Sequence, residues 1–404
     1  MVPVSDDRIV PVTMPKWGLS MQLGKITAWA VGEGDDVKAG DDLADIETEK
    51  ISGTLEAADG GTVRRIVARV GEDVPVSGTI ALLAPADVTD ADLDAAVQEA
   101  RAVIDAGVPD DAAGGPDLQT TDVGGRRISF AGAGEDGDVV LLVHGYGGDR
   151  NSWLFLQEPL AARYRVYALD LPGHGASAKD VGDGTLDVLA GAVTGVLDAL
   201  GAERAHLVGH SLGGAAVLAA AARDPGRIAS LTLIAPAGFG AEINVGYLRG
   251  FADAQSRREL KPVVTQLFAD ESLVTRQLVD DLLAYKRLDG VDEALHTLLG
   301  VLLDGDAQGV NSAALLAAAG GAGAGGAGAG DTGAGDTEAG HAGAGGAVPV
   351  TVVWGRDDRI IPAAQAEAVT GADHRLIDDA GHMPHMEHPA QVQAAIEQNI
   401  ARAT

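Results

Sequence analysis

From about residue 121 onwards, hydrophobic residues fall in short continuous runs separated by longer amphipathic stretches. The runs are Val139–Val143, Val166–Leu169, Ala205–Val208, Leu231–Ile234 and Pro349–Trp354. Continuous apolar strands that alternate with helices are typical of a mainly parallel sheet covered on both faces. We therefore predict an α/β domain over residues 121–404. Residues 238–316 interrupt this pattern with helical sequence and no strand signal, which predicts a helical cap.

The first 85 residues contain short apolar runs broken by turn sequences such as VGEGDD and ADGG, which predict many short strands. A quasi-repeat with an offset of 37 residues runs through this segment. Gly34, Asp36, Val37 and Ala44 recur as Gly71, Asp73, Val74 and Ala81. Two similar halves predict a small barrel or sandwich with internal two-fold symmetry, and chance similarity in a Gly/Asp-rich segment is the alternative.

Two further segments connect or interrupt these domains. Residues 86–120 predict a linker with one helix, because Thr89 and Asp92 resemble an N-terminal capping box. The apolar stripe that follows consists of Leu93, Val97, Ala100 and Ile104. Residues 317–347 are mostly Gly and Ala with almost no large apolar side chain, so they bury little apolar area and we expect an unstructured insert.

Charge and composition narrow the possible functions. The 404 residues include 59 acidic and 29 basic side chains, a formal net charge of −30. Such a charge repels phosphate backbones and anionic lipid, which argues against nucleic-acid or membrane-surface binding. The absence of cysteine excludes disulfides, thiolate metal sites and a catalytic thiol. The N-terminus has no secretory signal pattern and no stretch is hydrophobic enough to span a bilayer, so we expect a cytoplasmic protein.

A serine lies in the pattern expected of a nucleophile elbow. Ser211 is the centre of GHSLG, which follows the strand AHLVG and precedes a helical stretch. In an elbow the serine occupies a strained strand-to-helix turn, and glycines two residues before and after relieve crowding. A serine that only caps the helix is the alternative. Backbone N–H groups of Tyr146 and Leu212 are candidate donors to an oxyanion.

The partners of such a serine follow in the order acid, then histidine. Asp357 and Asp358 both follow the apolar strand PVTVVW, and a carboxylate at that strand end can orient an imidazole. Three histidines compete for the role of base: His382, His385 and His388. Their HxxHxxH spacing also raises the possibility of a metal site, but it lies in a segment broken by proline, and we expect no metal.

Lys50 lies in DIETEKI, between the two quasi-repeats, and the pattern predicts that it occupies an exposed hairpin tip. From the residues alone, a solubilising lysine is the simpler interpretation. However, the segment from MPKWGLSMQLGKITAWAVGEGDD to VGEDVPVSGTIALL resembles a lipoyl domain over its full length. The resemblance implies an all-β barrel-sandwich over residues 1–85, with lipoate in amide linkage on Lys50. Biotin domains share this fold, but their lysine is usually flanked by methionines, whereas Glu49 and Ile51 stand here.

Residues 121–404 resemble the α/β-hydrolases, on the evidence of VHGYGG, DLPGHGAS, GHSLG and the Gly-x-x-Asp-x-x-x-Pro spacing. The spacing of that family selects Asp358 as the acid, and its Ala-Gly-His pattern selects His382 as the base. His144 is then expected to hold the loop of Tyr146. His206, His210 and His374 are expected to be structural or surface residues.

A lipoyl domain fused to an α/β-hydrolase resembles the acyltransferase component of acetoin dehydrogenase complexes. The resemblance implies transfer of an acyl group from dihydrolipoyl-lysine to coenzyme A, with dehydrogenase and dihydrolipoamide dehydrogenase components as partners. The His-x-x-x-Asp-Gly motif of the usual 2-oxo-acid dehydrogenase acyltransferase is absent, and no two-helix peripheral-subunit-binding module is evident. A serine hydrolase with a lipoyl carrier, and a carrier with a non-catalytic scaffold, are the alternatives. The presence of all three candidate catalytic residues, Ser211, Asp358 and His382, argues against the non-catalytic scaffold.

Overall fold

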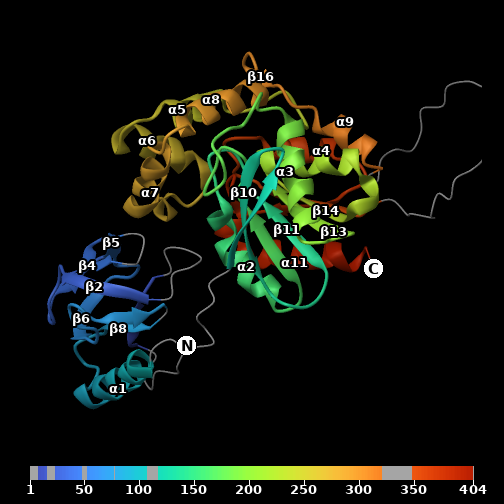
Figure 1. Cartoon of the computed structure of the whole chain (residues 1–404). Coiled ribbons are helices and arrows are strands. Elements are labelled where there is room, and N and C mark those ends of the chain that lie inside the picture. Colours follow the sequence, from blue (N-terminus) through green and yellow to red (C-terminus); the bar gives the residue numbers. More distant parts are fainter. Residues whose placement is uncertain are drawn as a thin grey trace, which may run out of the picture. The chain divides into compact units, whose positions relative to one another are not determined.

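The computed structural model describes residues 8–15, 23–47, 52–76, 78–106, 117–320 and 348–403. The chain divides into two compact units, Met1–Pro116 and Asp117–Thr404 (Figure 1). Within the described ranges, every helix is too short or too polar to cross a bilayer.

The N-terminal unit is built from two four-stranded sheets with the orders β1-β8-β6-β3 and β5-β4-β2-β7. The strands are β1 Val10–Thr13, β2 Leu23–Trp29, β3 Asp36–Val37, β4 Asp42–Glu47, β5 Ser52–Glu56, β6 Gly61–Ile66, β7 Asp73–Pro75 and β8 Thr79–Leu83. All pairs within both sheets are antiparallel. The prediction of an all-β barrel-sandwich for this part of the chain is confirmed.

The sheets also show the internal symmetry that the quasi-repeat predicts. Strands β2, β3 and β4 lie about 37 residues before β6, β7 and β8 in the sequence. Each of these strands occupies the same position in one sheet as its counterpart does in the other. Backbone hydrogen bonds repeat in the same way. Gly34 N–H donates to Val63 O and Gly71 N–H donates to Ile26 O, both at 2.7 Å. The symmetry predicted from the quasi-repeat is therefore confirmed.

Helix α1, Asp90–Ala106, lies in the stretch predicted as a linker and packs against this unit. The Thr89 hydroxyl accepts the Asp92 N–H at 3.2 Å, as the capping pattern predicts. Leu93 and Ile104 are buried in the same apolar cluster as Ile80 and Leu82 of β8. The helix is therefore part of the N-terminal unit.

The C-terminal unit has an eight-stranded sheet of order β18-β17-β14-β13-β11-β12-β10-β9. Its strands are β9 Asp117–Val123, β10 Arg126–Ala133, β11 Val139–Val143, β12 Arg165–Leu169, β13 Ala205–His210, β14 Ile228–Ile234, β17 Val350–Gly355 and β18 Asp373–Ile377. The six strands from β18 to β12 are parallel, and the β9–β10 hairpin is antiparallel. The predicted α/β-hydrolase architecture is confirmed.

Helices cover both faces of this sheet. They are α2 Leu154–Ala161, α3 Leu186–Ala199, α4 Leu212–Arg223, α10 Pro384–Glu387 and α11 Pro389–Ala401. Successive residues of β11 alternate between the two resulting cores. Val139, Leu141 and Val143 pack with α3 and α4, whereas Val140 and Leu142 pack with α2 and α11. Because the strand is buried on both faces, it reads in the sequence as one continuous apolar run.

The helical cap follows β14 and lies over one end of the sheet (Figure 1). It contains α5 Val245–Asp253, α6 Arg257–Val264, α7 Arg276–Lys286, α8 Val291–Leu302 and α9 Ser312–Ala318. The predicted absence of strands in the cap is wrong, because β15 Leu303–Asp304 and β16 Ala307–Gln308 form a short antiparallel pair. Helix α9 packs on α4 and extends into the start of the predicted insert. Residues 321–347 of that insert lie outside the described residues.

Two buried histidines join the loop after β11 to the loop after β12. His144 Nδ1–H donates to Gly145 O at 2.8 Å, and its Nε2 accepts the Leu171 N–H at 3.0 Å. His174 Nδ1–H donates to Pro172 O at 3.0 Å, and its Nε2 accepts the Gly147 N–H at 3.1 Å. Each loop thus supplies an imidazole to a backbone N–H of the other.

Both imidazoles must be neutral to accept these hydrogen bonds. Burial lowers the pKa of His144 to about 4, and the charge of Arg150 acts in the same direction. Burial, together with the neighbouring His144, lowers the pKa of His174 to about 3. The reciprocal histidine pair therefore stays intact at neutral and mildly acidic pH.

We predict that acidification below pH 6.5 destabilises the protein partly through these two residues. The unfolded histidines, with an ordinary pKa near 6.5, bind protons that the folded ones do not, so stability falls with pH until the folded pKa of about 3 to 4 is reached. Each contributes a loss of about 1.5 kcal/mol between pH 6.5 and 5. In urea unfolding at pH 5 to 7, His174→Gln should show a flatter pH dependence than wild type. Equal slopes would contradict this assignment.

Candidate active site

Ser211 occupies the tight turn between β13 and α4. Its backbone angles are φ 53° and ψ −117°, and a side chain in this region costs about 1–3 kcal/mol. The turn is held by the Ser211 N–H, which donates to Ile234 O of the neighbouring strand at 2.9 Å. The strained strand-to-helix geometry that the GHSLG pattern predicts is therefore present at this serine.

The two glycines of the pattern lie where backbone segments meet. A Cβ at Gly209 would lie 2.5 Å from Gly213 O, and a Cβ at Gly213 would lie 2.3 Å from Val143 O. Any larger residue would collide with backbone that cannot move away easily. The crowding that the sequence pattern anticipates is thus a close approach of β13, α4 and the end of β11.

Asp358 and His382 form a buried hydrogen-bonded pair. His382 Nδ1 and Asp358 Oδ2 are 2.8 Å apart, and the two side chains are 2% and 0% exposed. The carboxylate also accepts Ile360 N–H at 2.8 Å, Ile361 N–H at 3.0 Å and Trp354 Nε1–H at 3.0 Å. A buried carboxylate needs such donors to replace its lost hydration. Because Asp358 accepts at Nδ1, the imidazole is oriented with Nε2 available for chemistry.

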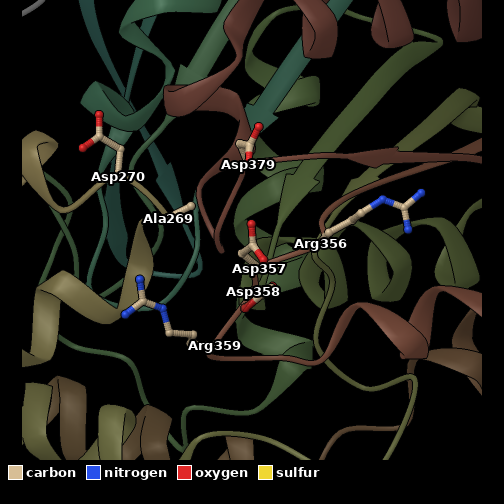
Figure 2. Close-up of a pocket in the computed structure, with 7 residues that line it drawn as sticks. All are labelled: Ala269, Asp270, Arg356, Asp357, Asp358, Arg359 and Asp379. Atoms are coloured by element: carbon tan, nitrogen blue, oxygen red, sulfur yellow. The ribbon is translucent and has the colours of Figure 1, made fainter.

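Asp357 is in a different environment, although it is the adjacent residue. It is exposed, and its backbone N–H donates to Ala380 O at 2.9 Å. It lines an open depression of about 600 Å³ together with Ala269, Asp270, Arg356, Asp358, Arg359 and Asp379 (Figure 2). Ser211 and His382 are not among the seven lining residues, so this depression is not the space around the serine. The structure therefore brings Asp358, and not Asp357, to His382.

The loop of Tyr146 passes beside Ser211. A Cβ added to Gly145 would lie 2.9 Å from Ser211 Cβ. The loop is fixed at the residue after Tyr146, where the Gly147 N–H donates to His174 Nε2. Leu212 is the first residue of α4, and the N–H groups of a first helical turn have no acceptor within the helix. The two backbone groups predicted as oxyanion donors thus belong to the two segments that flank the serine.

In the described part of the structure, neither of the other histidines of the HxxHxxH segment is hydrogen-bonded to the Asp358 carboxylate. His388 Nε2 bonds Asp379 O at 3.0 Å. His385 is fully buried, its pKa is lowered to about 3 by burial and by His382, and neither ring nitrogen has a partner among the described residues. Among those residues, no group of three His, Cys, Asp or Glu side chains is arranged to hold a metal ion.

Glu387 has a role that no motif in the sequence signals. Its Oε2 accepts the Gly381 N–H and its Oε1 accepts the Ala269 N–H, both at 2.7 Å. The His382 N–H donates to Leu267 O at 2.7 Å. The loop that carries His382 is therefore fastened to the cap at two points. The only trace in the sequence is a carboxylate five residues after the histidine.

Lys50 lies outside the described residues, so the structure does not test its predicted modification. The strands on either side of it are described. β4 and β5 are antiparallel, and Glu47 pairs with Ser52. Residues 48–51, which include Lys50, are the part of the chain between these two paired strands.

Comparison with known proteins supports both units. A family described as alpha/beta hydrolase fold matches residues 138–389, and one described as biotin-requiring enzyme matches residues 10–83. The structure is similar to a meta-cleavage product hydrolase from Pseudomonas fluorescens. The TM-score is 0.58 and the sequence identity 19%, over 71% of this chain and 98% of the other. This likeness concerns the fold alone.

Two relatives are similar over almost the entire chain. The dihydrolipoyllysine-residue acetyltransferase component of the acetoin cleaving system of Cupriavidus necator is 44% identical over 393 residues, 97% of each chain. The component of the same name from Pseudomonas putida is 44% identical over 386 residues, 95% of this chain and 96% of the other. The resemblance predicted from the motifs is confirmed. The chain belongs to the family of dihydrolipoyllysine-residue acetyltransferase components of acetoin cleaving systems.

Proposed function

We propose that this protein transfers an acetyl group from a lipoyl thioester to coenzyme A through Ser211, His382 and Asp358. The observation that carries the proposal is the buried Asp358–His382 hydrogen bond, in the same domain as a serine on a strained elbow. The acetyl group, the dihydrolipoyl donor and the class of enzyme are inferred from the names of the two relatives.

In the first half-reaction, Ser211 Oγ attacks the thioester carbonyl and His382 Nε2 takes the hydroxyl proton. Asp358 stabilises the imidazolium that forms. The Tyr146 and Leu212 N–H groups donate to the oxygen that becomes negative, and one such donor contributes about 3–4 kcal/mol to the transition state. The thiol leaves with the proton from His382, and an acyl-serine remains.

In the second half-reaction, the thiol of coenzyme A is the acceptor. His382 removes its proton as the sulfur attacks the acyl-serine carbonyl, and then returns the proton to Ser211 Oγ. Water in place of coenzyme A would give hydrolysis by the same residues. The acceptor is therefore the property that separates a transferase from a serine hydrolase.

Lys50 is the residue that we propose to hold lipoate, in amide linkage to its Nζ. The register of β4 and β5 fits this role, since the two strands pair directly from Glu47 to Ser52 and Lys50 is one of the four residues between them in the sequence. When bound, the lipoyl group carries an acyl group as a thioester on a long tether. Tethering raises the effective concentration of the acyl group at successive active sites.

The relatives belong to acetoin cleaving systems. We propose dehydrogenase and dihydrolipoamide dehydrogenase components as the partners of this chain. Between the two predicted domains, the described residues contain one helix, α1, and it packs on its own unit.

We predict that wild type forms acetyl-coenzyme A from free S-acetyl-dihydrolipoamide, and that Ser211→Ala lowers the rate by several orders of magnitude. Lys50→Arg should keep this activity, because the donor is free, but should lose the lipoyl adduct in intact-mass analysis. Thioester cleavage and acetate release are measured with and without coenzyme A. Acetate release at the same rate in both conditions would identify a hydrolase instead.

Asp358→Asn should lower kcat by about 10³- to 10⁴-fold, because an amide cannot stabilise the imidazolium and favours the wrong tautomer. Asp357→Asn is the matched control: it makes the same chemical change one residue away, at an exposed position, and should retain activity close to wild type. Steady-state kinetics of both variants with S-acetyl-dihydrolipoamide test this. A greater loss in Asp357→Asn would reverse the assignment.

A further inference from the structure

The side chain before the proposed nucleophile reaches the proposed base. His210 ends β13 and directly precedes Ser211. Its Nε2 lies 2.9 Å from the backbone O of His382, 172 residues further along the chain. A carbonyl oxygen only accepts hydrogen bonds, so Nε2 carries the proton and donates it. One residue of the elbow is thus bonded directly to the loop that carries the base.

This hydrogen bond is protected from water and from protonation. His210 is 4% exposed. Burial lowers its pKa well below the ordinary value, and His385 and His382 add to this effect. The ring remains neutral, and its second nitrogen faces Gly145, where an added Cβ would lie 2.8 Å away. The imidazole therefore fits tightly between the loop of Tyr146 and the loop that carries His382.

His382 has contacts on its other sides as well. Asp358 holds the ring through Nδ1, and the Leu267 carbonyl of the cap accepts its backbone N–H at 2.7 Å. Neither of these contacts involves β13 or the elbow. The His210 bond, together with the contact between the two rings at a centroid distance of 4.8 Å, joins the base to the strand that carries Ser211.

We propose that His210 is a positioning residue that sets the placement of His382 relative to Ser211. The inference rests on the proposed function, since it assumes that these two residues react together. The catalytic proton moves between Ser211 Oγ and His382 Nε2, and such transfers depend steeply on distance. The bond to the His382 carbonyl restrains that distance from the nucleophile side.

His385 provides an internal comparison. It is fully buried, and its ring packs on that of His210 at a centroid distance of 4.6 Å. Trp153 packs on His385 at 4.7 Å. Unlike His210, His385 has no hydrogen-bond partner at either ring nitrogen among the described residues. The two histidines therefore share burial and ring packing, and differ in the bond to the base.

The test compares His210→Phe with His385→Phe in the full-length protein. Each variant keeps a buried aromatic ring and loses the ring nitrogens. The rate of labelling of Ser211 by a fluorophosphonate, and kcat and KM for S-acetyl-dihydrolipoamide, are measured together with the melting temperature. His210→Phe should lower the labelling rate and kcat by about 10- to 100-fold with little change in KM. His385→Phe should retain both rates.

A second pair of variants separates positioning from folding. Gln and Met have similar shapes, but only the amide of Gln can donate to the His382 carbonyl. His210→Gln should therefore be several-fold faster in labelling than His210→Met, and this comparison remains informative if the Phe variant does not fold.

Equal rates in the Gln and Met variants, or equal losses in His210→Phe and His385→Phe, would overturn the positioning role. Failure of the probe to label Ser211 in wild type would instead overturn the proposed function. Labelled wild type with unchanged His210→Phe would refute only the role of His210.

Discussion

The site depends on a carboxylate that has been removed from water. The side chain of Asp358 is 0% exposed, and its hydration is replaced by two backbone N–H groups, the Trp354 indole and His382. An ionised carboxyl group is costly to bury without such donors. The turn after β17 must therefore wrap around this side chain, and the loop after β18 must bring His382 against it. The positions of both loops therefore follow from the need to give the Asp358 carboxylate its hydrogen-bond donors.

Around this pair, neutral imidazoles connect segments that are distant in the sequence. His144 and His174 join two loops to each other, and His210 joins the elbow to the loop that carries His382. A neutral imidazole can donate and accept at once, and it loses less free energy on burial than a charged side chain. This suits a small site in which several backbone groups must be fixed without adding charge near the proposed oxyanion donors.

Much of this arrangement could be predicted from the sequence, because the signals are local. The continuous apolar runs mark strands buried on both faces, and GHSLG places Ser211 between β13 and α4. The preference for Asp358 over Asp357 rested on motif spacing. The structure adds a physical reason, since Asp358 points inward to the Trp354 and backbone donors.

Other features could not be predicted, because they arise from contacts between distant segments. The bonds of Glu387 to Gly381 and Ala269, and that of His210 to His382, leave no periodic pattern in the chain. The pair β15–β16 has two residues per strand, too few for an alternation of apolar and polar positions to show.

The packing of α1 against the N-terminal unit has a consequence for reach. If α1 were part of a free linker, the connection between the two units would include its length. Because Ile104 is buried in the N-terminal unit, the helix belongs to that unit, and only the ten residues 107–116 separate it from β9. Ten residues span at most about 35 Å. A connection this short keeps the effective concentration of an acyl group on the first unit high at the second unit, where Ser211 lies.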